Sequence, residues 1–588
     1  MYTASDYIVD FLKDKNINKA FVVTGGACAF IIDAMGRSKN FKYTSFHHEQ
    51  SAAMAADAVY RVDNSTIGVT VATSGPGATN LITGIACSYF DSIPSIHLTG
   101  QVNSKESARY LKSNVRQAGF QETDIVNMVK PITKASKKIE DFEDLKKTLD
   151  EFYTLSISGR MGPVLLDIPM DIQQQEVPKF ISHKVDISKK SHMLSDLDIK
   201  KIDEFFKNSK RPLLLFGAGI GLSNSQEIVI DWVNTNEVPF VSSWNGMTYF
   251  NHNNVNYYGH IGVYGNRGSN NIIQNCDALL VLGSRLDNRQ RGSSTDQFAP
   301  GARKLVIDID VNELNKYDNS YETIQLDLYN VQRLLEKIKF QKIEESWKQY
   351  INKQKNKYLF KDVSTYYKHN NSISPYAITE KIVSNLPNNS ILVPECGANL
   401  CWVYQTMKID NSIVFTSGGN SPMGYTIPAC IGAKLTSPDK AVFGILGDGG
   451  FQMNIQELQT IKFLKLNIKF FIYNNFGYGI IKQFQDTYMS SRYEASGKGY
   501  SQPDFQEIAK IFDFKYKKID SLSDLNIADL KSDESIIFDI ILDPNTEIEP
   551  KTEMGRVIND QFPYQSEKEF KSNNQFFLES YNYNRPKS

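Results

Sequence analysis

Short apolar segments followed by glycine-rich turns recur along this chain and restrict the folds that it can adopt. Continuous apolar strands are typical of parallel sheets buried on both faces, and their alternation with amphipathic helices indicates α/β domains. The sequence therefore predicts an α/β protein with three doubly wound parallel-sheet domains. The strand-like segments are AFVVTGG at 20–26, TIGVTVATS at 66–74, SIHLTG at 95–100, PVLLDIP at 163–169, RPLLLFGAG at 211–219, ALLVLGS at 278–284, KLVIDID at 304–310, SILVPECG at 390–397, AVFGILGDGG at 441–450 and KFFIYNN at 469–475.

These segments fall into three groups, separated by polar and charged stretches near 176–195 and 341–370. Such stretches are typical of linkers. A chain of 588 residues also suggests three or four domains. We expect an N-terminal domain at 1–178, a central domain at 190–342, a C-terminal domain at 368–560, and a tail at 561–588 that forms a surface helix with a loose end.

The composition excludes several classes of protein. The formal net charge is −1, so no strong field favours nucleic acid or an acidic membrane surface. No apolar stretch reaches the roughly 18 residues that a membrane helix needs, and the N-terminal segment lacks the pattern of a secretion signal. Of the six cysteines, only Cys396 and Cys401 lie close together. This usage favours free thiols in a reducing cytoplasm.

Two apolar strands end in polar residues that can bind a metal and a phosphate. One strand ends in the GDG of residues 447–449, and the other ends at Asn474 and Asn475. Because parallel strands end at one edge of their sheet, these residues should lie close together. The segment between the strands has a helical pattern whose apolar face carries Phe451, Ile455, Leu458 and Ile461.

The residue types at these strand ends suit Mg²⁺ and a diphosphate. Asp448 offers a carboxylate oxygen and Asn475 an amide oxygen, and Mg²⁺ prefers a few protein oxygens together with phosphate oxygens. Gly447, Gly449 and Gly450 let backbone N–H groups approach a phosphate at a helix start. The alternative is a glycine turn beside an unrelated asparagine turn. In its strand–helix–strand context, however, the motif resembles the signature of thiamine diphosphate enzymes.

Thiamine diphosphate chemistry also requires a carboxyl group. The aminopyrimidine of the cofactor must remove the C2 proton, and it needs a carboxyl group on its ring nitrogen to become the right tautomer. Glu49 is a candidate, since it opens the alanine-rich helix predicted within FHHEQSAAMAADAVYR at 46–61. A glutamate at a helix start can equally be a solvated cap.

These motifs resemble those of the acetolactate synthase (acetohydroxyacid synthase) family, and the resemblance covers nearly the whole chain. It implies an enzyme that decarboxylates pyruvate and transfers the resulting two-carbon unit to a second carbonyl compound. The product is acetolactate if that acceptor is pyruvate. The matching segments are VVTGGA at 22–27, HEQSAAMAADAVYR at 48–61, ATSGPGATNLITGIA at 72–86, GFQETDIV at 119–126, GPVLLDIPMDIQ at 162–173, GSRLDNR at 283–289, FAPGARKLVIDID at 298–310 and SPMGYTIPACIGAK at 421–434.

The resemblance implies roles for the residues that match these motifs. Glu49 would be the activating acid, and Asp448, Asn475 and the carbonyl group of Gly477 would bind Mg²⁺. Met423 would lie beneath the cofactor and force its bent form, with an ordinary core methionine as the alternative. Further contacts with the cofactor would come from Gly25, Pro76, Asn80, Gly397, Ala398, Asn399, Ser421, Gly447, Gly449, Gly450, Gly479 and Ile480.

Other matching residues would border the substrates. Phe120 and Gln121 would lie beside the reacting centre. Arg289 would bind an acceptor carboxylate with its planar guanidinium group; the alternative is a surface arginine that closes a loop. Phe484 takes the place of the tryptophan with which the family selects its acceptor, so the preference for 2-ketobutyrate is not expected here.

Two further positions depart from the family and leave the acceptor open. Met170 replaces the usual lysine after its strand, and Lys551 stands in a segment that is usually apolar. We interpret Lys551 as solvated, since lysine is seldom buried. At the site entrance it would instead meet an anionic acceptor. The leading hypothesis is therefore a 2-keto acid acceptor, and the alternative is a nucleotide-linked keto-sugar that becomes branched for polysaccharide biosynthesis.

The central region carries a glycine pattern that is weak on its own, GAGIG at 217–221. Together with IGVYGNRGSN at 261–270 and RLDNR at 285–289 it resembles the flavin region of the family. The resemblance implies bound FAD with little or no redox duty, and Arg285 and Asp308 are candidate contacts.

The resemblance also implies an assembly. In the family, the catalytic glutamate of one subunit reaches the cofactor held by another, so we expect a homodimer or homotetramer with active sites at the subunit interface. Nothing indicates a regulatory small subunit. A simple decarboxylase or a flavin-dependent pyruvate oxidase is disfavoured by the GFQE and RLDNR segments. A non-catalytic homologue is disfavoured by the intact Glu49, Asp448 and Asn475.

Overall fold

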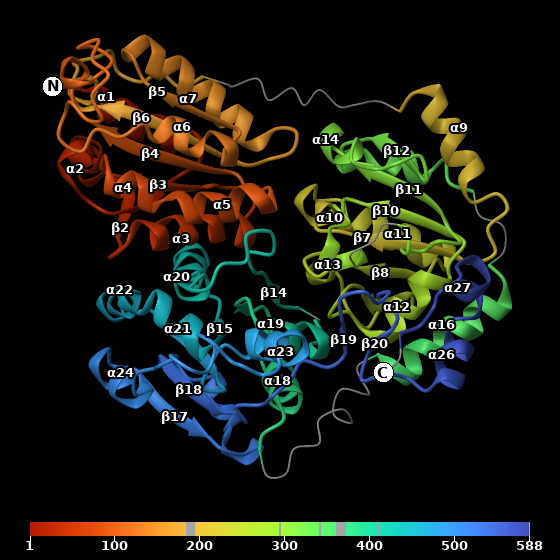
Figure 1. Cartoon of the computed structure of the whole chain (residues 1–588). Helices are drawn as coiled ribbons and strands as arrows, with labels where there is room; N and C mark the ends of the chain where they lie inside the picture. The colour runs from red at the N-terminus through yellow and green to blue at the C-terminus, as the bar shows by residue number, and fades with distance from the viewer. Residues whose placement is uncertain (184–193, 293–295, 340–342, 360–371, 410, 587–588) are drawn as a thin grey trace.

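The computed structural model describes residues 1–588 apart from 184–193, 293–295, 340–342, 360–371, 410 and 587–588. It contains three six-stranded sheets in which neighbouring strands are parallel, and a two-stranded antiparallel ribbon, β19 (Lys551–Thr552) with β20 (Gln561–Phe562). Figure 1 shows three bodies, each built from one sheet with helices packed against it. The predicted fold class is confirmed.

The N-terminal sheet has the strand order β2-β1-β3-β4-β6-β5. Its direction of winding reverses between β1 and β3, so the loops that follow these two strands border a crevice suited to a ligand. The strands are β1 (Lys19–Val22), β2 (Lys42–Ser45), β3 (Gly68–Ala72), β4 (Ser95–Gln101), β5 (Ala135–Lys138) and β6 (Pro163–Pro169). The helices are α1 (Ala4–Asp14), α2 (Ala29–Arg37), α3 (Glu49–Val62), α4 (Pro76–Asn80), α5 (Ile82–Asp91), α6 (Ile125–Val129), α7 (Phe142–Ile157) and α8 (Met170–Gln173).

The central sheet has a different order, β12-β11-β10-β7-β8-β9. This is the order of dinucleotide-binding folds, and its reversal lies between β7 and β10. The strands are β7 (Pro212–Phe216), β8 (Phe240–Ser242), β9 (Tyr257–His260), β10 (Ala278–Leu282), β11 (Arg303–Asp308) and β12 (Tyr321–Gln325). The helices are α9 (Asp196–Phe205), α10 (Gly219–Leu222), α11 (Gln226–Asn236), α12 (Arg267–Asn275), α13 (Asn288–Arg291), α14 (Val311–Leu314), α15 (Val331–Leu335) and α16 (Glu345–Tyr358).

The C-terminal sheet, of order β14-β13-β15-β16-β18-β17, repeats the topology of the N-terminal one. Its reversal lies between β13 and β15, and β15 ends at the GDG turn. The strands are β13 (Ile391–Pro394), β14 (Ile413–Val414), β15 (Val442–Gly447), β16 (Ile468–Asn474), β17 (Lys515–Ile519) and β18 (Ile536–Ile541). The helices are α18 (Pro375–Val383), α19 (Ala398–Thr406), α20 (Thr426–Thr436), α21 (Asp448–Met453), α22 (Leu458–Leu464), α23 (Gly479–Tyr488), α24 (Phe505–Ile511) and α25 (Ile527–Leu530).

The N-terminal and C-terminal domains share a core through the alanine-rich helix α3. Its small side chains, among them Ala52, Ala55 and Ala56, belong to one buried cluster with Ile427 and Cys430 of α20. Small residues let two helix backbones approach closely, which explains the run of alanines. The predicted alanine-rich helix is confirmed, and its close packing fixes the position of Glu49 at the start of α3.

Polar side chains extend the same interface. The Arg61 guanidinium pairs with Asp57 at 2.7 Å and with Asp91 at 2.8 Å. Asp91 in turn accepts hydrogen bonds from the backbone N–H groups of Gly418 and Gly419 at 2.8 and 2.7 Å. Buried charges are retained when they are paired in this way. The network ties the segment that precedes Met423 to the N-terminal domain.

Three expectations from the sequence are wrong. The segment near 341–370 is not simply a linker, because α16 buries Trp347 and Ile351 against the central domain. The C-terminal tail does form a helix, in two pieces, α26 (Glu567–Asn573) and α27 (Gln575–Ser580), which Figure 1 shows beside α16. Its described end is not loose, however, because Tyr583 and Arg585 both donate hydrogen bonds to Asp560. The helix predicted after the GDG turn is interrupted at Asn454, between α21 and a short 3₁₀ helix (Ile455–Glu457).

Among the described residues, no helix is both long enough and apolar enough to cross a membrane. The cysteines are all unpaired, and five of the six are buried.

Candidate cofactor and active site

The strand ends of the C-terminal sheet bring the GDG turn and the asparagine pair together, as predicted. β15 and β16 are neighbours, with Gly447 in register with Tyr473. Asp448 is 1% exposed. Its two carboxylate oxygens accept hydrogen bonds from the backbone N–H groups of Gly449 at 2.7 Å and Gly477 at 3.1 Å. Burial raises the pKa of Asp448 to about 6, and a bound divalent cation would favour the charged form instead.

The two asparagines that end β16 have different surroundings. Asn474 donates to Asp539 at 3.0 Å and accepts from Gln502 at 3.1 Å, so it holds the turn in place. Within the described part of the chain, the Asn475 side chain makes no hydrogen bond. Its amide oxygen therefore remains free to bind a ligand.

These groups form an oxygen donor set that suits Mg²⁺. It would comprise the Asp448 carboxylate, the Asn475 amide oxygen and the Gly477 carbonyl oxygen, with phosphate oxygens completing the coordination. The described residues contain no group of three or more His, Cys, Asp or Glu side chains that could hold a metal alone.

Glycines around Asp448 leave a cradle at the switch point of the sheet. Gly397 follows β13 with φ +100°, a conformation that favours glycine. A Cβ atom on Gly397 would lie 3.3 Å from Asn399 Oδ1, and one on Gly449 would lie 3.2 Å from Met423 Cε. Met423 therefore faces the GDG turn rather than a distant core. Gly479 and Ile480 open α23 directly behind Asn475, and a Cβ atom on Gly479 would lie 3.8 Å from Ala398 Cβ.

Asn399 has a structural task in addition to its predicted one. Its amide nitrogen donates to the carbonyl oxygens of Glu395 and Ile445 at 3.1 and 3.2 Å. The side chain thus holds the ends of β13 and β15 at a fixed separation.

The predicted residues of the N-terminal domain form a second cluster at the edge of their own sheet. Glu49 is 8% exposed, and its Oε2 accepts a hydrogen bond from Asn80 at 2.9 Å. The interpretation as a solvated cap is therefore wrong. A Cβ atom on Gly77 would lie 3.2 Å from Glu49 Oε1, so the start of α4 covers the carboxylate. Pro76, the first residue of α4, is exposed.

Three more residues border this N-terminal cluster. Gln121 has φ +62°, which is uncommon for a residue other than glycine, and it packs against Gly75. Phe120 is 84% exposed, an unusual state for a phenylalanine. Gly25 packs closely against Thr73, since a Cβ atom on Gly25 would lie 2.6 Å from Thr73 Cβ.

The two clusters do not meet within the chain. Among the described residues, no hydrogen bond or ion pair joins the predicted residues around Glu49 to those around Asp448. Neighbouring residues do link the two domains; for example, the Ser51 hydroxyl donates to Asn454 at 3.0 Å.

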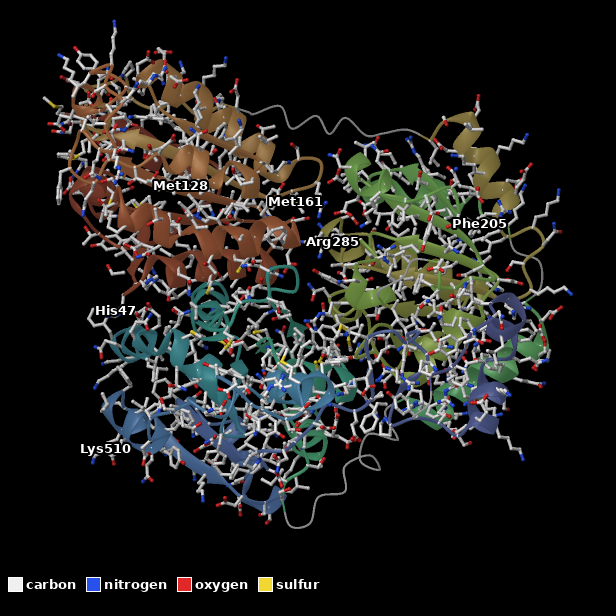
Figure 2. The ribbon with its side chains drawn as sticks, viewed as in Figure 1. His47, Met128, Met161, Phe205, Arg285 and Lys510 are labelled. Atoms are coloured by element: carbon white, nitrogen blue, oxygen red, sulfur yellow. The ribbon has the colours of Figure 1, made fainter. Side chains whose placement is uncertain are left out.

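A cavity of about 760 Å³ lies where the three domains meet. Figure 2 shows Arg285 of the central domain and Met161 of the N-terminal domain at this junction. Gly219 and Gly283 approach each other at the switch point of the central sheet, with φ +61° at Gly283. The cavity brings together predicted residues of the central and C-terminal domains, namely Arg285, Arg289, Asp308 and Ser421.

The predicted acceptor residues lie around α23 and the central domain. Phe484 is 41% exposed and packs against Tyr488 with ring centroids 4.8 Å apart. Tyr488 accepts a hydrogen bond from the Met554 backbone at 2.6 Å. Arg289 is exposed, with its guanidinium 5.7 Å from the Tyr264 ring centroid. Met170 begins α8.

Lys551 is not solvated, contrary to our interpretation of the sequence. It is 8% exposed, and its ammonium group donates to the Thr487 hydroxyl at 2.9 Å. Burial lowers its pKa, although Glu547, Glu553, Asp486 and Glu549 surround it and act in the opposite direction. The ammonium group is therefore enclosed and held by Thr487 rather than presented on an open surface.

Sequence reasoning missed several residues that shape the site. Tyr478 and Tyr500 pack edge to face with ring centroids 5.0 Å apart beside the GDG turn. Glu395, at the end of β13, is 1% exposed and accepts a hydrogen bond from Gly424 at 2.8 Å. The only available signal for Glu395 was a carboxyl group within an apolar segment, SILVPECG, since a buried acid needs specific partners.

Comparison with known proteins agrees with this geometry. The chain matches three family models: the N-terminal thiamine pyrophosphate (TPP) binding domain of thiamine pyrophosphate enzymes over residues 2–128, their central domain over 199–335 and their C-terminal TPP binding domain over 395–532. The fold and the matched domains together define a thiamine diphosphate-dependent enzyme.

Relatives of similar length identify the family. The chain is 32% identical to the acetolactate synthase large subunit of Cyanidium caldarium over 89% of this chain and 90% of the relative. It is 31% identical to that of Lactococcus lactis subsp. lactis over 94% and 95%, and 30% identical to the isozyme 2 large subunit of Escherichia coli over 86% and 89%. The chain belongs to the acetolactate synthase large-subunit family.

Proposed function

We propose that this protein is a carboligase that decarboxylates pyruvate and transfers the two-carbon unit to a second 2-keto acid. The observation that carries the proposal is the pair of clusters around Glu49 and Asp448, each complete and each at the switch point of its own sheet. Bound thiamine diphosphate would accept the electrons that are released when carbon dioxide leaves. The protein would supply position and electrostatics.

The residues around Asp448 would hold the diphosphate end of the cofactor. Asp448, Asn475 and the Gly477 carbonyl would bind Mg²⁺, and the glycines at 447, 449 and 450 would leave their N–H groups close to phosphate oxygens. Met423 would support the ring end from below. Glu49 would hold a proton at the pyrimidine ring nitrogen, because its carboxyl group is buried and has one orienting partner, Asn80.

We propose that two copies of the chain form the active site together. In a single chain, Glu49 and Asp448 belong to separate clusters. Phe120, near Glu49, is 84% exposed, and Phe484, in α23, is 41% exposed. A second copy would cover these aromatic side chains and bring one chain's Glu49 to the other's Asp448, as a symmetric dimer allows. A tetramer would pair two such dimers.

We further propose that FAD occupies the cavity between the three domains, with a positioning rather than a redox duty. The central sheet has a dinucleotide-binding order, and the glycine turns at Gly219 and Gly283 leave room at its switch point. Arg285 and Asp308 line the cavity.

The flavin proposal makes a simple prediction. Purified, undenatured protein should absorb light at about 450 nm, because the flavin ring absorbs there. Heat denaturation should release that absorbance into the supernatant. Colourless protein that also fails to take up added FAD would contradict the proposal.

The acceptor proposal follows from the surroundings of Lys551. The keto-sugar alternative depended on an accessible positive charge at this position, and Lys551 is instead buried with its ammonium group bonded to Thr487. Phe484 and Tyr488 form an apolar surface that suits the short carbon chain of a 2-keto acid, and Arg289 would bind its carboxylate.

An acceptor screen tests this choice. Pyruvate is supplied as the donor with Mg²⁺ and thiamine diphosphate, and the products formed with pyruvate, 2-ketobutyrate and a nucleotide-linked keto-sugar are identified by mass spectrometry. We expect acetolactate with pyruvate and no product from the keto-sugar. A branched sugar as the main product would replace our proposal with the alternative.

A further inference from the structure

The buried carboxyl group of Glu395 has been given no role in the site so far, yet it contacts two of the turns of the site. Glu395 follows β13 and is 1% exposed. Its Oε1 accepts hydrogen bonds from the backbone N–H groups of Gly424 at 2.8 Å and Thr426 at 3.4 Å. Gly424 directly follows Met423. A buried carboxyl group is stable only with such donors, and here they attach the Met423 turn to the end of β13.

The other carboxyl oxygen of Glu395 fills the space beside Gly450. A Cβ atom on Gly450 would overlap Glu395 Oε2 and would lie 2.6 Å from Cδ. Glu395 cannot turn away without losing its bond to Gly424, because it is fully enclosed. The position of the Glu395 side chain therefore requires a glycine at position 450. The same carboxyl group thus lies between the turn that carries Met423 and the turn that carries Asp448.

The Met423 turn is held from its opposite side by Asn454. The Asn454 amide nitrogen donates to the Gly424 carbonyl oxygen at 2.7 Å. Gly424 has φ +84°, and a Cβ atom on it would lie 2.6 Å from Met453 Cβ. Both polar groups of the Gly424 backbone are therefore bonded, one to Glu395 and one to Asn454. The turn has little freedom to move relative to the GDG motif.

Glu395 also suits a place beside a diphosphate. Burial raises its pKa to about 8, so much of it is protonated near neutral pH. It then adds little negative charge next to the phosphate groups, although it keeps a carbonyl-type oxygen to accept from Gly424.

We propose that Glu395 is a positioning residue that fixes Met423 relative to the diphosphate-binding turn, through Gly424 on one side and Gly450 on the other. The inference rests on the proposed function for the place of Met423 beneath the cofactor. It assigns Glu395 no contact with the reacting atoms. Its effect should therefore appear in how readily the bound cofactor loses its C2 proton, which requires the bent form, more than in how tightly the cofactor binds.

A double-mutant cycle tests the proposal with Gly450→Ala, Glu395→Asp and the combination of both. The readouts are the thiamine diphosphate dissociation constant and the C2 hydrogen–deuterium exchange rate of the bound cofactor, measured by quench and proton NMR. Gly450→Ala should slow exchange by at least about tenfold, as expected for a clash in a packed site. In the double variant the shorter aspartate leaves room for the methyl group. The exchange rate should therefore be about tenfold higher than the rate expected if the two single-variant reductions were simply multiplied. Additive effects would overturn the proposal.

Two further variants separate positioning from other roles. Glu395→Gln keeps the length and the acceptor oxygen, and it should retain an exchange rate within about threefold of the wild-type rate. A loss as large as that of Gly450→Ala would mean that the acid itself takes part in the chemistry. Gly497→Ala is the matched glycine control in the same domain, since its Cβ atom would make only an ordinary contact of 3.6 Å with Tyr493.

The outcomes remain distinguishable from failure of the proposed function. Wild-type protein that shows no C2 exchange and no carbon dioxide release would contradict the proposed function. Wild-type exchange with an additive cycle would contradict the role of Glu395 alone. Should Gly450→Ala fail to fold, the comparison of Glu395→Asp with Glu395→Gln carries the test, with slowed exchange expected only for the aspartate.

Discussion

Replacing Glu49 with glutamine is expected to slow C2 hydrogen–deuterium exchange of bound thiamine diphosphate by about 10²–10⁴-fold, the usual share of a general acid or base. The amide keeps the size and the contact with Asn80, so the fold and the affinity for the cofactor should change little. The measurement is quench-flow exchange read by proton NMR, with the rate of pyruvate consumption falling in parallel.

A matched control for this variant is Glu143→Gln. Glu143 lies in the same domain, at the start of α7, and its side chain is 79% exposed. The cofactor bound to the Glu143→Gln variant should exchange its C2 proton at the wild-type rate. An unchanged rate in Glu49→Gln would show that the buried carboxyl group has no part in cofactor activation, despite its burial and its orienting partner.

Replacing Asp448 with asparagine is expected to weaken binding of thiamine diphosphate with Mg²⁺ by more than about 100-fold, since even the outer partners of metal ligands are each worth about 10–100-fold. The change removes the only carboxylate of the proposed donor set and weakens the acceptor for Gly477. Isothermal titration of the cofactor at fixed Mg²⁺ measures the effect. The same titration in the absence of Mg²⁺ should show a much smaller difference between wild type and variant.

The control for Asp448 is Asp439→Asn, an exposed aspartate in the same domain just before β15. It should bind the cofactor as the wild type does. If Asp448→Asn binds within threefold of the wild type, the metal is held elsewhere and the proposed donor set is wrong.

The sequence predicted most of the inner strands, although not β8 or β18, and it predicted the site motifs for the same physical reason. Strands such as β3, β7 and β16 are buried along their whole length, so they are continuous apolar runs, and the ligand-binding turns follow their carboxyl ends. Edge strands were missed. β2, β5 and β17 read as KYTS, ASKK and KYKKI, because an edge exposed to water carries polar and charged residues.

The errors in the sequence analysis arose where tertiary contacts decide the outcome. α16 is polar over most of its length and still buries Trp347 and Ile351, because a narrow apolar stripe is enough to attach a helix. Lys551 illustrates the same limit. Lysine is seldom buried, but here the Thr487 hydroxyl and nearby carboxyl groups, which are brought together only by the fold, make its burial tolerable.

Within the candidate site, residue types predicted the chemistry but not the supporting contacts. Asp448 and Asn475 stood out because their spacing and their strand ends are characteristic. The sequence suggested Asn475 as a metal ligand, but it gave no sign that Asn474 supports the turn through Asp539 and Gln502. Likewise the pairing of Glu395 with Gly450 joins residues 55 positions apart, and only the fold shows that one side chain occupies the space of the other.

The central claim is that this protein joins a two-carbon unit from pyruvate to a second 2-keto acid. The most direct test is the stoichiometry with pyruvate as sole substrate, thiamine diphosphate and Mg²⁺ being present. Carbon dioxide is collected and pyruvate consumption is followed in the same reaction. We predict that twice as much pyruvate is consumed as carbon dioxide is released, with acetolactate as the product. Equal amounts of both, with free acetaldehyde, or no carbon dioxide at all, would contradict the account.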